Sequence, residues 1–150
     1  MTDFTRRVYT RPFVCWLAGG AGAVFLLVGI LGFIPGVTTD FDQLKFADND
    51  STAELLGIFQ VSILHNIVHI LFGIAGLALM RQAKTAQGYL IGGGALYLAL
   101  WIYGLAIDFD STANFLPLND ADNWLHLGLG AVMVIGGLLP LATNNSRRLT

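Results

Sequence analysis

The sequence predicts an all-α membrane protein, a bundle of four transmembrane helices that forms a single domain over residues 1–150. Two observations predict this class. The chain is 55% hydrophobic and only 12% charged, whereas about a quarter of the residues in ordinary soluble domains are charged. Its mean hydropathy is +0.65, and four apolar segments each reach the roughly 20 residues that cross a bilayer as a helix. The segments are 13–34, 52–80, 86–107 and 121–143.

The first segment begins at Phe13 and contains no charged residue as far as Ile34. Its length of about 22 residues is enough to cross the hydrocarbon core of a bilayer. A proline and a glycine follow it, and these residue types end helices. We therefore expect a transmembrane helix over 13–34 and a polar, acidic loop over 35–51.

The second segment carries a signal for the start of a helix. Ser51-Thr52-Ala53-Glu54 fits a capping box, in which the serine caps the helix and the glutamate reaches back to the serine amide. This motif predicts a helix over 52–80. At 1.5 Å per residue such a helix is roughly 43 Å long, so we expect its first turns to protrude from the bilayer or the helix to tilt.

The third and fourth segments are separated by an acidic loop. The stretch 86–107 is uncharged over about 22 residues, which predicts a third transmembrane helix. The stretch 108–123 contains four aspartates and neither lysine nor arginine. The apolar run that follows predicts a fourth helix over 121–143.

The positions of the basic residues predict the orientation of the bundle. Every lysine and arginine except Lys45 lies in the N-terminal arm, in the loop between the second and third segments, or in the C-terminal tail. By the positive-inside rule both termini are cytoplasmic and the two acidic loops lie outside. The net charge of −2 and the lack of a basic cluster exclude a nucleic-acid partner. The expected partner of the helices is the lipid bilayer.

Polar residues interrupt the apolar run of the second segment on one side only. At 100° per residue, Ser62, His65, Asn66 and His69 share an arc of roughly 100°, together with two glycines. Isoleucine, leucine and valine occupy the other directions. This is the pattern of a helix with one protein-facing stripe and lipid elsewhere.

The fourth segment repeats this pattern. Asn66-x-x-His69-x-x-x-Gly73 recurs 57 residues later, beginning at Asn123, with His126 in place of His69. Asp122 falls on the same arc by helical geometry. Both segments are expected to cross the bilayer in the same direction, so the sequence is compatible with a parallel repeat of two helix pairs.

Three interpretations of this polar face stay open. In the first, Ser62, Asn66, Asn123 and the histidines form hydrogen bonds between helices, each contributing about 0.6–2 kcal/mol to helix association. In the second, the histidines bind a cofactor, either a b-type haem held by one histidine from each of two facing helices or a transition metal. In the third, the face is a proton, quinone or small-molecule site. The structural interpretation is the one we favour.

A metal ion would draw on a wider set of residues than a haem. The candidate ligands on the polar face are His65, His69, His126 and Asp122. Imidazole is the commonest protein ligand for transition metals, and a carboxylate is a suitable companion.

The sequence lacks the signatures of common catalytic sites. Cys15 is the single cysteine, and there is no phosphate loop, no CxxC and no Ser-His-Asp order. We therefore expect a protein that is not an enzyme but an accessory or scaffold protein, which contacts other membrane proteins or a second copy of itself. Gly88-x-x-x-Gly92 and the two glycines after it predict a close-packing face used inside the bundle.

Two strings resemble a known family. They are residues 55–79, L-L-G-I-F-Q-V-S-I-L-H-N-I-V-H-I-L-F-G-I-A-G-L-A-L, and residues 122–130, D-N-W-L-H-L-G-L-G. With G-F-I-P-G-V-T at 32–38, they resemble the bacterial membrane family catalogued as domain of unknown function 4383. The resemblance implies a small four-helix, multi-pass protein of the bacterial plasma membrane. It implies no catalytic residues, because that family has no established activity.

Overall fold

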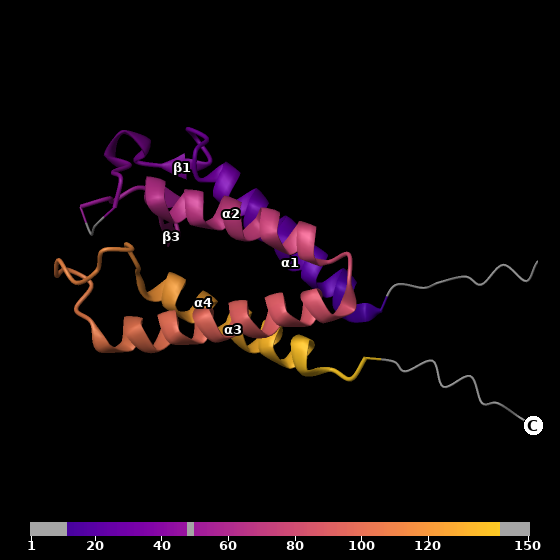
Figure 1. Ribbon diagram of the computed structural model, residues 1–150. Coiled ribbons are helices and arrows are strands. Elements are labelled where there is room, and N and C mark those ends of the chain that lie inside the picture. Colours follow the sequence, from indigo (N-terminus) through magenta and orange to yellow (C-terminus); the bar gives the residue numbers. More distant parts are fainter. Residues whose placement is uncertain (1–11, 48–49, 142–150) are drawn as a thin grey trace, which may run out of the picture.

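The computed structural model describes residues 12–47 and 50–141, and these form four helices and a small sheet (Figure 1). In chain order the elements are α1 (Phe13–Leu31), β1 (Thr38–Thr39), a 3-10 turn η1 (Phe41–Gln43), β2 (Glu54–Leu55), β3 (Phe59–Gln60), α2 (Ile63–Leu79), α3 (Ala83–Ala106) and α4 (Asp120–Leu138). The predictions that concern the N-terminal arm and the C-terminal tail fall on residues outside this part of the chain.

The four helices form two antiparallel hairpins. We call α1 with α2 the first hairpin and α3 with α4 the second hairpin. They form two layers that lie one over the other in Figure 1, with α1 and α3 running in the same direction. The short α2–α3 connection, the start of α1 and the end of α4 lie at one end, which we call the terminal end. The sheet and the loop between α3 and α4 lie at the other, the sheet end.

The second predicted helix begins too early. α2 starts at Ile63 and not at residue 52, because the residues before it form β2 and β3. The expected capping box at Ser51 is wrong: the Ser51 hydroxyl is buried and donates to the Val61 carbonyl instead. The helix is capped by Ser62, whose side chain accepts from the His65 amide. A helix-start motif is a local signal, and here the tertiary position of the serine overrides it.

The start of α1 at Phe13 is as predicted, and the remaining helix ends differ from the prediction by one to five residues. α1 ends at Leu31, because the amides that follow bond to carbonyls three residues back and not four. Phe33 donates to the Ile30 carbonyl, and Ile34 donates to the Leu31 carbonyl. α4 ends at Leu138, since Leu139 precedes a proline and adopts an extended conformation. The start of α3 lies three residues before the predicted one, at Ala83.

The sheet was not predicted. Its strands pair antiparallel in the order β1-β2-β3, with Leu55 opposite both Thr38 and Phe59. Ala53, Leu55 and Val61 are buried in a small core under the sheet, where Val28 and Leu31 of α1 pack against them. The acidic loop therefore lies on the first hairpin as a folded cap.

Glycines set the spacing inside each hairpin. A Cβ at Gly22 would lie 2.8 Å from the Leu77 amide nitrogen of α2, and a Cβ at Gly94 would lie 2.8 Å from the Gly130 carbonyl of α4. Both hairpins thus bring two backbones into contact, as small residues allow in membrane helices. The prediction for α3 was half wrong, because Gly88 and Gly92 face outward, and a Cβ added at either would meet no heavy atom within 4 Å.

Two of the four predicted transmembrane helices meet a length and composition requirement for crossing a membrane. These are α1, with a mean hydropathy of 2.2 over its most apolar window, and α3, with 1.5. α2 is apolar but has only 17 residues, and α4 begins with two aspartates in its first turn. By length and composition, two helices of the described part of the chain could therefore cross a membrane, and four crossings are not shown.

Candidate functional site

The polar face lies on α2 and α4, and each cap or buried residue of α2 corresponds to a residue of α4 that lies 57 positions later. Their N-caps are Ser62 and Asn119, and each accepts from the backbone amide three residues on. The buried residues of α2 all have buried counterparts in α4. These pairs are Asn66 and Asn123, His69 and His126, Gly73 and Gly130, and Gly76 and Met133.

The partner helices α1 and α3 show a second equivalence, at 72 residues. Gly22 and Gly94 make the close helix contacts, and Phe25 and Tyr97 are the large buried aromatic residues at matching positions. Further matching glycines, Gly32 and Gly104, lie against the asparagine side chains of α2 and α4. Each hairpin thus places an aromatic ring of its first helix beside a histidine of its second helix.

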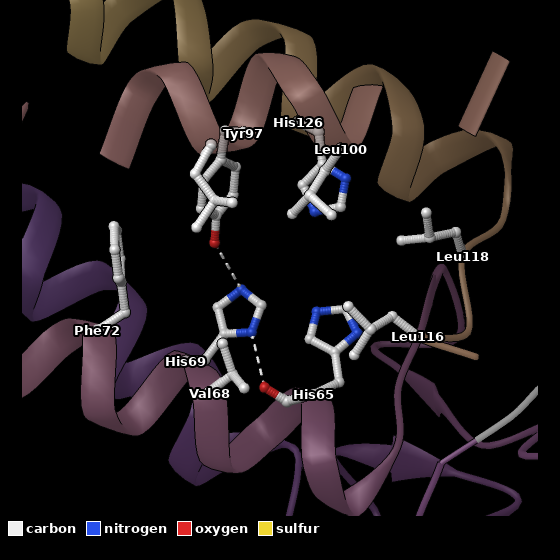
Figure 2. Close-up of a pocket in the computed structure, with 10 residues that line it drawn as sticks. His65, Val68, His69, Phe72, Tyr97, Leu100, Leu116, Leu118 and His126 are labelled. Carbon is white, nitrogen blue, oxygen red and sulfur yellow. Dashed lines mark hydrogen bonds between the residues drawn. The ribbon is translucent and has the colours of Figure 1, made fainter. Parts of the chain in front are cut away.

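The three histidines meet in one space between the hairpins, which we call the histidine chamber. Figure 2 shows His126 and Tyr97 on one side of it, facing His65 and His69 on the other. The chamber has two lobes, with cavity volumes of about 50 Å³ and about 110 Å³, and these four residues line both. The sequence predicted that the histidines share a face, and the structure brings all three to one cavity.

Apart from these four shared residues, the two lobes are lined mainly by apolar side chains. The first lobe lies between α2 and α3, with Val68, Phe72, Leu96, Leu100, Leu116 and Leu118. The second lies between α1, the sheet and α4, with Val28, Leu31, Leu55, Leu56, Phe59, Val61, Leu125 and Asp122. Among the described residues that line the two lobes, none is a lysine or an arginine.

His69 has both ring nitrogens in hydrogen bonds. Nδ1 lies 3.0 Å from the His65 carbonyl one turn back, and since a carbonyl only accepts, Nδ1 carries the proton. Nε2 lies 3.1 Å from the Tyr97 hydroxyl of the other hairpin (Figure 2). In the neutral ring Nε2 is the acceptor, so the Tyr97 hydroxyl donates to it. His69 is therefore a satisfied link between the hairpins, as the structural interpretation expects.

His65 and His126 differ from His69 in this respect. Within the described chain, the Nδ1 atom of each is buried and has no hydrogen-bond partner. His65 stacks on His69 with ring centroids 4.5 Å apart. The ring of Tyr97 packs edge-on to His126 at 5.0 Å, and His126 as a whole is only 4% exposed. The rings of these two histidines line the mostly apolar chamber, and each has one buried nitrogen, Nδ1, without a partner.

The asparagines do not form the interhelical hydrogen bonds expected of them. Both side-chain polar atoms of Asn66 and the Oδ1 atom of Asn123 are buried and without a partner in the described residues. Their side chains pack instead against Gly32 and Gly104. At these positions, close packing brings together the two helices within each hairpin.

Asp122 is used to fasten the sheet to the second hairpin. One carboxylate oxygen accepts from the Asn119 amide at 3.2 Å, which completes a capping box, and from the Gln60 amide of β3 at 2.9 Å. Asn119 also donates to the Ile58 carbonyl at 2.8 Å. Asp122 borders the second lobe, but its position is explained by these bonds without a metal ion.

The donors available for a metal or haem are fewer than the sequence indicated. Within residues 12–47 and 50–141, no three His, Cys, Asp or Glu side chains are grouped so as to hold a metal ion. His69 is committed to Tyr97 and to its own helix. The nitrogens free to bind a cofactor or ligand are those of His65 and His126.

Sequence reasoning missed Tyr97, Phe72 and the loop residues Leu116 and Leu118. Nothing in the pattern of α3 marks Tyr97, since that helix is apolar on most sides. One signal was available: Tyr97 follows Phe25 by the same 72 residues that separate Gly22 from Gly94.

Residues 16–139 match the family described as Domain of unknown function (DUF4383). The chain belongs to this family. The match includes all four helices except the first three residues of α1, and the whole of the histidine chamber. Comparison of the chain with curated proteins and with solved structures found no match.

Proposed function

We propose that the protein is a multi-pass membrane protein whose histidine chamber binds a small, largely apolar molecule. The observation that carries the binding role is the convergence of the His65, His69 and His126 rings on one mostly apolar cavity, in which His65 and His126 each keep an unpaired Nδ1. Small-molecule sites typically combine apolar walls with a few convergent polar groups.

The membrane location is supported by the outward faces of the helices. Large apolar side chains are exposed on all four helices. They include Val24 and Leu27 on α1, Leu71 and Ile74 on α2, Ile102 and Leu105 on α3, and Val132 and Ile135 on α4. In water so much exposed apolar surface would cause aggregation, whereas in a bilayer it is the solvated surface.

The orientation that we propose places the terminal end in the cytoplasm and the sheet end outside. The α2–α3 connection carries Arg81 and Lys84, and the remaining arginines precede α1 or follow α4. The sheet end carries the acidic loops. Under the positive-inside rule this charge distribution supports a plasma-membrane protein with both termini inside.

The two hairpins support a duplicated helix pair as the origin of the bundle. The N-caps, the buried residues and the glycine contacts recur at constant spacing within each helix pair. A parallel repeat places a shared site at the interface between its halves. The histidine chamber lies at that interface.

A bound molecule explains the unpaired nitrogens better than a purely structural role does. A buried polar atom without a partner costs about 1–3 kcal/mol, so structural histidines are found satisfied, as His69 is. The accessory or scaffold role expected from the sequence stays a prediction, and it is compatible with ligand binding.

The test is to purify the full chain from its own membrane in mild detergent and to extract it with organic solvent. We expect mass spectrometry to find a small molecule at a near-stoichiometric ratio. His126→Leu should lose this molecule, whereas Ile135→Leu, on the outward face of the same helix, should keep it. An equal, empty result for wild type and both variants would contradict the proposal. A Soret band or stoichiometric metal would replace it with the cofactor interpretation.

A further inference from the structure

The opening of the first lobe points to the source of the ligand. Val68 of α2 and Leu96 of α3 both line this lobe, and both are also exposed on the outer surface, by 45% and 49%. The lobe therefore reaches the surface along the seam between α2 and α3, through a rim of apolar side chains. Under the proposed membrane placement this seam faces the acyl chains of the bilayer and not water.

The second lobe opens on the other side of the bundle in the same way. Leu56, in the turn between β2 and β3, and Leu125 of α4 line it and are exposed by 60% and 39%. The shared residues His65, His69, Tyr97 and His126 lie between the two lobes. An elongated molecule that entered at the α2–α3 seam would bring one end to the histidines.

The histidines define the chemistry of that end. A neutral imidazole offers one N–H donor and one acceptor nitrogen, so two such rings are best matched by a group that both donates and accepts. A hydroxyl does both. The His65 ring also approaches the Pro117 carbonyl, which uses part of the hydrogen-bonding capacity of this ring.

The charges around the chamber exclude the commonest lipid head groups. A phosphate or a carboxylate requires a cationic partner, and the described residues that line the lobes include no lysine or arginine. Asp122, the acidic residue among them, offers an anion no positive charge. A quaternary ammonium is also disfavoured, because such cations are held by aromatic cages and not by two free imidazoles.

We propose that the chamber takes a neutral lipid with a hydroxyl head group, which enters from the bilayer between α2 and α3. This inference rests on the proposed function, since it names the ligand class of the same site. The hydroxyl lies between His65 and His126, the first carbons of the chain lie along Val68, Phe72 and Leu96 in the first lobe, and the rest of the chain extends out of the α2–α3 seam into the bilayer.

The experiment is photolabelling of the full chain in phosphatidylcholine vesicles with a long-chain alcohol that carries a diazirine in its chain. Mass spectrometry of the peptides locates the label. We expect the label on the α2 and α3 residues of the first lobe, above the level on the outward residue Ile74. Unlabelled hexadecanol should compete, whereas hexadecanoic acid at pH 8 should not.

Two kinds of variant separate the entry route from the head-group site. Val68→Trp and, independently, Leu96→Trp should reduce chamber labelling to the level of the outward surface, whereas Ile74→Trp, an exposed position outside the lining, should not. His126→Leu should reduce labelling about tenfold, the loss expected from one good hydrogen bond. Circular dichroism of each variant confirms that the helices are retained.

The outcomes distinguish this inference from the proposed function. Competition by hexadecanoic acid and not by hexadecanol would overturn the hydroxyl lipid while keeping a binding site. Labelling that is unchanged in both Val68→Trp and Leu96→Trp would overturn the lateral entry. Labelling spread evenly over the outward faces, with no competitor effective and no molecule recovered by solvent extraction, would overturn both proposals.

Discussion

The two hairpins share one packing plan but differ in the polar groups at two pairs of equivalent positions. The first hairpin has Phe25 where the second has Tyr97, and His65 where the second has Asp122. The first difference decides how the histidines are paired. The Tyr97 hydroxyl donates to His69 across the chamber. Phe25 has no hydroxyl, so it cannot form the equivalent bond with His126.

The second difference divides two tasks between equivalent positions. Asp122 binds the amide of Gln60 and fastens the sheet to α4. His65, at the matching place on α2, lines both lobes and keeps a buried Nδ1 unpaired. A symmetric scaffold thus becomes an asymmetric site, with the structural bonds on His69 and Asp122 and the free nitrogens on His65 and His126.

The largest effect is expected where the hairpins are most alike. Gly22→Leu and Gly94→Leu should each destabilise the bundle by about 3 kcal/mol or more, because a side chain would force two helix backbones apart. Unfolding in a denaturing detergent, followed by circular dichroism, measures the loss. Gly20→Leu and Gly92→Leu are the matched controls, since both positions have open space. A tolerated leucine at one of the two contacts would break the equivalence of the hairpins.

The next effect sharpens the contrast between Asp122 and His65. Asp122→Ala should cost about 2 kcal/mol, because it removes a capping residue and leaves the Gln60 amide without its acceptor. His65→Ala should cost less, since the His65 side chain caps no helix. Proteolysis of the loop between β1 and β2 reports release of the sheet. Equal costs, with no change in proteolysis, would show that Asp122 does not fasten the sheet.

A smaller effect tests the bond between the hairpins. Tyr97→Phe makes the second hairpin like the first at this position and should cost about 1 kcal/mol, because His69 Nε2 loses its partner. A double-mutant cycle with His69→Leu isolates the bond. In the His69→Leu background the tyrosine change should have little effect, and an undiminished cost there would place the role of Tyr97 elsewhere.

The sequence predicted the helices better than their ends. Apolar length is a property of composition, so all four helices were found. The start of α2 was missed because the Ser51 motif satisfies a local rule, while the Ser51 hydroxyl bonds to Val61 through tertiary folding. The sheet was missed because its strands are two residues long and because β1 pairs with β2 across an intervening loop of 14 residues.

The candidate site was predicted in part for a similar reason. Helical periodicity places residues on one face, and this brought His65, His69, His126 and Asp122 together correctly. Periodicity says nothing of which nitrogen finds a partner, because that depends on the neighbouring helix. Tyr97, which forms a hydrogen bond with His69 and none with His126, lies on α3. Its neighbours in the sequence are apolar, so no polar pattern points to it.

The most direct test of the account compares His126→Leu with His69→Leu for stability and for bound molecule. After the ligand has been removed, His69→Leu should lose about 0.6–2 kcal/mol, since it removes the link to Tyr97. His126→Leu should leave stability unchanged or raise it, because an unpaired buried nitrogen is replaced by an apolar group, and it should abolish retention of the molecule. A loss of stability in His126→Leu equal to that in His69→Leu, with the bound molecule retained, would contradict the division of the histidines into a structural one and a ligand-binding one.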